Sequence, residues 1–108
     1  MKKAAVVIWY NPRPEFVENI RSFLDHVQAV IVVDNSEGDN SHLLGGLERV
    51  QYFPQLENKG IAAALNIGCE IAKQLGVEWV LTMDQDSSFD PSDISTLISL
   101  VSTIESYA

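Results

Sequence analysis

The chain has 108 residues, with 15 acidic and 7 basic side chains and a formal net charge of −8 at pH 7. A chain of this length forms at most one domain, and its ordinary share of apolar residues can close one core. The acidic balance argues against a nucleic-acid-binding protein, because such proteins gather Lys and Arg on one face.

Residues 4–10 (AAVVIWY) form a continuous apolar run that is typical of a strand buried in a parallel sheet. Asn11 and Pro12 end this run before any signal-peptide cleavage site. From Glu15, apolar residues at spacings of three and four predict a helix: Val17, Ile20, Leu24 and Val27. Residues 29–33 (AVIVV) predict a second buried strand, and the polar segment 34–40 predicts a loop.

The alternation continues with a short helical turn expected at 43–47 and a weaker third strand at 50–53. Gly76 is expected to end a long helix whose apolar stripe consists of Ala63, Ile67, Ile71 and Leu75. Residues 79–83 predict the fourth strand, and Asp90 and Pro91 predict the start of a last helix. This order predicts an α/β fold with a mostly parallel sheet of about four strands and flanking helices.

Both long apolar runs, 4–10 and 29–33, are far shorter than the about 20 residues that a membrane span needs. The single Cys69 can form no internal disulfide, which suits a reducing compartment. We therefore expect no transmembrane segment and a cytoplasmic protein. The inner face of the membrane is the alternative location if the chain is part of a larger enzyme.

Polar residues follow three of the predicted strands. In an open parallel sheet, ligands bind beyond the carboxyl ends of the strands, near the point where strand order reverses. Tyr10 and Asn11 follow the first strand, Asp34 follows the second and Asp84 follows the fourth. We expect these residues to converge on one rim of the sheet.

Asp84 and Asp86 stand one residue apart in WVLTMDQDSSFD and would repel each other without a cation. Mg²⁺ is commonly held by one or two carboxylates together with substrate phosphates, so the pair predicts a divalent metal site. A solvated turn capped by the two acids is the alternative. Asp34 has two interpretations. Its carboxylate either accepts hydrogen bonds from a base or a ribose of a ligand, or it forms a local Asx-turn.

Four motifs stand in the order and approximate spacing of one enzyme family: IWYNP, IVVDNS, ENKGIAAALNIG and VLTMDQDSSF. Together they make the chain resemble the inverting glycosyltransferases of family two, which have the GT-A fold. The D-Q-D-S and N-K-G-I-A segments are most similar to bacterial rhamnosyltransferases, which use dTDP-rhamnose for cell-surface polysaccharide. The resemblance implies that residues 1–108 are the N-terminal nucleotide-sugar-binding part of a GT-A domain without its acceptor half.

The resemblance also implies roles for individual residues. The nucleotide pocket would be lined by Tyr10, Asn11 and Pro12, the base bound by Asp34, and the adjoining turn formed by Asn58, Lys59 and Gly60. Asp84 would contact the ribose or a metal-bound water, and Asp86 would bind the Mg²⁺ or Mn²⁺ ion that bridges the diphosphate. Leu65 occupies the place of an Arg found in many relatives, so Lys59 or Arg13 would have to supply that positive charge.

The implied reaction is metal-dependent transfer with inversion, from a dTDP-sugar or alternatively a UDP-sugar to a saccharide or lipid-linked acceptor. The general base of the family lies well beyond the D-x-D motif, so we expect no transferase activity from this chain alone. Sheet edges left open by the missing half lead us to expect a homodimer of the truncated chain.

Other functions fit parts of the pattern. A haloacid-dehalogenase-like phosphatase would use Asp84 as nucleophile, but its motif usually follows the first strand and carries Thr or Val where this chain has Ser88. A receiver-like signalling module needs acids after the first strand, where this chain has Asn11 and Pro12. A nucleotide-binding module without catalysis is the third alternative.

Overall fold

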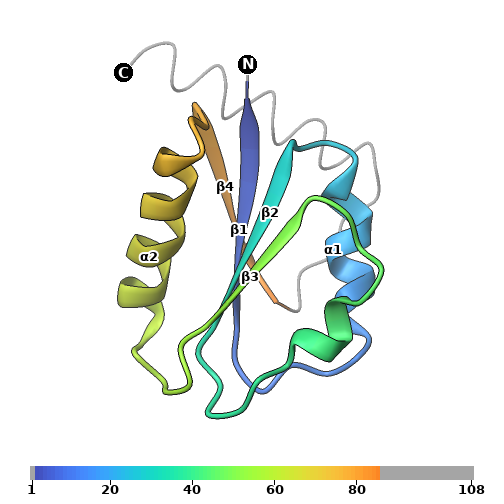
Figure 1. The fold of residues 1–108 in the computed structure, drawn as a ribbon, viewed down its shortest axis with the longest axis vertical. Coiled ribbons are helices and arrows are strands. Elements are labelled where there is room, and N and C mark those ends of the chain that lie inside the picture. Colours follow the sequence, from blue (N-terminus) through green and yellow to red (C-terminus); the bar gives the residue numbers. More distant parts are fainter. Residues whose placement is uncertain (1, 86–108) are drawn as a thin grey trace.

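The computed structural model describes residues 2–85, which form three layers with a sheet between helices (Figure 1). The strands are β1 (Lys3–Trp9), β2 (Ala29–Asp34), β3 (Val50–Pro54) and β4 (Trp79–Asp84), in the order β3-β2-β1-β4. Every neighbouring pair is parallel. The predicted α/β fold with a parallel sheet of about four strands is confirmed, while the expected helix from Asp90 lies outside the described residues.

The helices divide between the two faces of the sheet. The α1 helix (Phe16–Leu24) and the short 3-10 helix η1 (Ser41–Leu44) cover one face, and α2 (Ile61–Gln74) covers the other (Figure 1). Within residues 2–85, no helix is long and apolar enough to cross a membrane.

β1 is the central strand and has a buried side chain on both of its faces. Ala5, Val7 and Trp9 pack toward α1, while Ala4 and Val6 pack toward α2. Successive side chains of a strand point to opposite faces, so a strand covered on both sides must be apolar throughout. This is the physical reason for the unbroken apolar run that begins at Ala4.

The strand bounds differ from the predictions by one residue at several ends, and three differences in the structure are informative. β1 ends at Trp9 rather than Tyr10, because Asn11 has a φ of 46° and turns the chain away from the sheet. α1 ends at Leu24, although Val27 beyond it is still buried. The short helical turn begins at Ser41, whose N–H is bound by the Asp39 carboxylate, and not at Leu43.

The face that α2 turns to the sheet consists of small residues. Ala64, Gly68 and Ala72 are buried, whereas Leu75 of the predicted stripe is 38% exposed. A Cβ atom placed on Gly68 would overlap the Val6 side chain of β1. The larger side chains Ile67 and Ile71 pack at the flanks of this contact. Ile67 and Ile71 of the predicted stripe therefore do pack against the core, but the centre of the contact lies one position later, because the closest approach favours the smallest residues.

Substitution Gly68→Ala should lower the free energy of unfolding by about 1–3 kcal/mol, because overpacking outweighs the higher helix propensity of Ala. Chemical denaturation followed by circular dichroism measures this change. Gly38→Ala is the matched control, since a Cβ there meets nothing within 4 Å and its φ lies outside the left-handed region. Equal stability of the two variants would contradict the close packing of α2 on β1.

Candidate functional site

The carboxyl ends of the four strands meet at one rim of the sheet, at the lower end of Figure 1. The connection from β1 to β2 crosses one face through α1, and the connection from β3 to β4 crosses the other through α2. Strand order therefore reverses between β1 and β4. In open parallel sheets, the crevice at such a switch point is where ligands bind.

At this switch point, Gln85 joins the end of β4 to the end of β1. Its Oε1 accepts the Tyr10 N–H at 2.9 Å, and its Nε2 donates to the Tyr10 carbonyl at 3.1 Å. The Gln85 carbonyl in turn accepts a hydrogen bond of 2.9 Å from Asn19 Nδ2 of α1. Sequence reasoning missed Gln85 and Asn19, because no spacing or charge pattern marks a side-chain amide as a link between elements.

Further hydrogen bonds join β1, β2 and the start of α2. The Asn11 N–H donates to Ser36 Oγ at 2.7 Å, and the Asn35 N–H donates to the Trp9 carbonyl at 2.8 Å. Asn35 Nδ2 also donates to the Gly60 carbonyl at 3.2 Å. The buried Asn35 thus connects the end of β1 to the N-cap of α2, and Ser36 beside it binds the loop after β1.

The Asp34 carboxylate is fully buried and has three donors of its own. Oδ1 accepts the Ser36 N–H at 2.9 Å, while Oδ2 accepts Asn40 Nδ2 at 2.8 Å and the Tyr52 hydroxyl at 2.6 Å. The bond to Ser36 is the Asx-turn that the sequence left open as an alternative. A base N–H could reach this fully buried carboxylate only if the groups that cover it moved.

Tyr52 lies beside Asp34, and its hydroxyl donates a hydrogen bond to the Asp34 carboxylate. Burial and the hydrogen bond to Asp34 raise the pKa of the Tyr52 hydroxyl well above its usual value. The same hydroxyl accepts the Asn40 N–H at 2.7 Å, and the ring lies 6.2 Å from the Trp9 ring. Tyr52 therefore holds both the Asp34 carboxylate and the loop that follows β2.

The two acids of the rim share an edge but lie on opposite faces of the sheet. Asp34 pairs with Trp9, whose side chain faces α1, whereas Asp84 pairs with Ile8, which faces α2. The Asp84 side chain is exposed. The sequence predicted a common rim correctly but did not separate the two faces.

Of the two acids predicted to bind a metal ion, Asp84 ends β4 and Asp86 lies outside the described residues. Among residues 2–85 there is no group of three or more Asp, Glu, His or Cys side chains that could hold a metal. Carboxylate oxygens are the ligand type that Mg²⁺ and Mn²⁺ prefer, so the exposed Asp84 carboxylate is chemically suited to such an ion.

The remaining predicted residues surround the same rim. Asn58 Oδ1 accepts the Gly60 N–H at 3.0 Å, and Gly60 enters α2 with a φ of 87° that favours glycine. Lys59 is exposed and Pro12 is half-buried.

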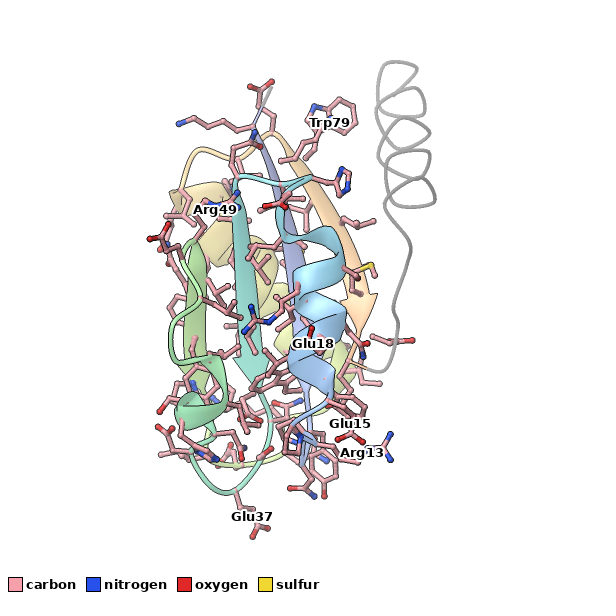
Figure 2. All side chains as sticks on the ribbon, turned by 90° about the vertical axis from the view of Figure 1, so that its right-hand side faces the viewer. Arg13, Glu15, Glu18, Glu37, Arg49 and Trp79 are labelled. Atoms are coloured by element: carbon pink, nitrogen blue, oxygen red, sulfur yellow. The ribbon has the colours of Figure 1, made fainter. Side chains whose placement is uncertain are left out.

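Arg13 lies at the same end of the molecule as Glu15 and Glu37 (Figure 2). Its side chain is bound by Glu15 at 3.2 Å and lies over the Phe16 ring. A ligand that needed Arg13 would therefore compete with Glu15.

Comparisons with known proteins agree with the motifs. The family model described as "Glycosyl transferase family 2" matches residues 4–106. The chain is also 32% identical over 88 residues to a protein of Shigella flexneri named dTDP-rhamnosyl transferase RfbF. The matched region covers 77% of this chain and 29% of that protein, so the chain spans less than a third of the length of this relative.

Substitution Tyr52→Phe should lower the free energy of unfolding at pH 7 by about 1–3 kcal/mol, because it removes a donor from a buried carboxylate. The pKa of Tyr52 is raised on folding, so its contribution is complete below the unfolded pKa of about 10 and falls as pH rises above it. Denaturation at pH 7, 10 and 11 measures both effects. A variant as stable as the parent, with the same slope above pH 10, would refute this role of Tyr52.

Proposed function

This chain belongs to glycosyl transferase family 2, and from that premise we propose that it forms the donor-binding part of an enzyme that transfers a sugar from a nucleotide-sugar. The observation that carries the proposal is the family match across residues 4–106, the region that contains all four strand ends of the rim. Membership in this family also sets aside the phosphatase and receiver alternatives.

We propose dTDP-rhamnose as the donor and a saccharide or lipid-linked saccharide as the acceptor. The support for rhamnose is the relative named dTDP-rhamnosyl transferase, and a UDP-sugar is the alternative donor. Cys69 is a free thiol exposed to solvent, which supports the proposed cytoplasmic location.

The nucleotide is assigned to the rim between the end of β1 and the start of α2. Tyr10 offers a side chain that is 49% exposed, with Asn11 and Pro12 following it. On the other side, Asn58, Lys59 and Gly60 form the turn that leads into α2. Asp34 is proposed to contact the base, which would then replace one of its present side-chain donors.

The start of α2 favours a negatively charged group of the donor. Its N-cap residue, Gly60, supplies no side-chain cap, and its first turn contains no acidic residue. The unsatisfied N–H groups and the positive end of the helix dipole therefore remain available at the rim. This environment suits a diphosphate, although the chain lacks a GxGxxG fingerprint.

Asp84 and Asp86 are proposed to hold the divalent ion. When bound, a Mg²⁺ or Mn²⁺ ion offsets the negative charge that develops on the departing diphosphate. Tyr10 and the turn at Asn58 would orient the donor, and an acceptor hydroxyl would attack the anomeric carbon from the face opposite the diphosphate. A carboxylate base would deprotonate that hydroxyl, and we assign no residue of this chain to the role.

Calorimetric titration of the chain with dTDP, UDP and GDP, each with and without Mg²⁺ or Mn²⁺, tests the proposal. We expect metal-dependent binding that is strongest for dTDP. The variants Asp84→Asn and Asp86→Asn should each weaken the metal-dependent part about tenfold or more, because each removes one carboxylate ligand.

Asp39→Asn is the matched control, since Asp39 is an exposed acid on the loop after β2 and the substitution removes the same charge. It should leave binding unchanged. Absence of metal-dependent binding to the folded parent chain, or an equal loss with Asp39→Asn, would count against the assigned metal site.

A further inference from the structure

The residue between the two acids, Gln85, has a role that its position in the sequence does not reveal. We propose that Gln85 is a positioning residue, which ties the acidic turn after β4 to the nucleotide side of the rim at Tyr10. This inference rests on the proposed function, because it concerns how the metal side and the nucleotide side of one donor site are held together.

The first observation is that one side-chain amide occupies both backbone groups of one residue. Gln85 accepts the Tyr10 N–H at 2.9 Å and donates to the Tyr10 carbonyl at 3.1 Å. The last residue pair of β1 and β4 is Ile8 with Asp84. The two hydrogen bonds between Gln85 and Tyr10 therefore connect the chain just beyond the ends of both strands. The two bonds also define the orientation of the amide. In the reverse orientation, the amide NH₂ would face the Tyr10 N–H and the amide oxygen would face the Tyr10 carbonyl.

The second observation is that the main chain of Gln85 is held as well. Asn19 Nδ2 of α1 donates to the Gln85 carbonyl at 2.9 Å, and Asn19 is half-buried. Gln85 is thus bound at its side chain by the end of β1 and at its carbonyl by α1. These contacts join residues 75 and 66 positions apart in the chain, so they constrain the tertiary arrangement and not only a local turn.

The third observation is that β4 pairs with a strand on one side only. Among the described strands it is at the edge of the sheet and pairs only with β1, while Leu81 and Met83 anchor it in the core. Beyond Asp84, the last residue of this pairing, the contacts of Gln85 hold the chain against the end of β1. The same contacts occupy the backbone N–H and carbonyl of Tyr10, so that only its exposed side chain remains available to a ligand.

Positioning of this kind should appear in the metal-dependent part of binding. Gln85→Met keeps a side chain of similar length but removes both the acceptor for the Tyr10 N–H and the donor to the Tyr10 carbonyl. Loss of this link should weaken binding most when the metal side and the nucleotide side of the rim are both engaged. A residue that merely fills space would tolerate Gln85→Met.

The experiment compares the parent chain and Gln85→Met in calorimetric titrations with dTDP at pH 7.5, with and without Mg²⁺ or Mn²⁺. With the metal ion, we expect the variant to bind about tenfold more weakly than the parent, which corresponds to the loss of one or two hydrogen bonds. Without the metal ion, the ratio of the two affinities should be about threefold or less, because only the nucleotide side of the rim is then engaged.

Gln55→Met is the matched control. Gln55 also donates its amide to a backbone carbonyl, that of Phe53, at the end of β3 on the other edge of the described sheet. Its affinity ratio to the parent should be close to one with and without the metal ion. A metal-dependent loss as large as that of Gln85→Met would assign the effect to the loss of any amide on the rim and would overturn the proposal.

A second variant, Asn19→Ala, removes the donor to the Gln85 carbonyl and leaves the side-chain bonds in place. We expect a two- to fivefold weaker affinity for dTDP in the presence of the metal ion. If Gln85→Met and Asn19→Ala both bind as tightly as the parent, the positioning role is refuted while the donor site stands. If the parent itself shows no metal-dependent nucleotide binding, the proposed function fails, and this inference fails with it.

Discussion

Pairing of β1 with a parallel strand on each side is the constraint on which the rest of the structure depends. It requires side chains that are apolar on both faces, and it places a helix over each face through the two crossovers. It also brings the ends of β1, β2 and β4 to one rim, so that residues from distant parts of the sequence become neighbours there. The position of the candidate site follows from this pairing.

The rim itself is held together mainly by neutral groups. Amide and hydroxyl donors from Asn40 and Tyr52 satisfy the buried Asp34, and amides of Asn35 and Gln85 connect the surrounding loops. The ion pairs of the described residues lie on the exposed surface instead, where such pairs contribute little stability. The geometry of the rim should therefore depend little on salt.

Much of this fold could be predicted because buried parallel strands have a strong signal, such as the run from Ala4. The contact face of α2 could not, since the position of closest approach at Gly68 is decided by packing and not by hydrophobicity. The faces of Asp34 and Asp84 depend on a register difference of one residue, which only the paired strands reveal. Gln85 was missed for a similar reason, because its partners are distant in the chain and its amide carries no charge.

The separation of Tyr10 and Gln85 along the chain has a consequence for synthesis on the ribosome. The strands β1, β2 and β3 can pair as soon as they emerge, but one edge of the central strand stays open until β4 has been made. During that interval an apolar strand exposes unpaired backbone groups, which favours aggregation and binding by chaperones. Pairing of β4 with β1 closes that edge and also completes the rim. A nascent chain would therefore form its ligand site in the same step that covers its unpaired strand edge.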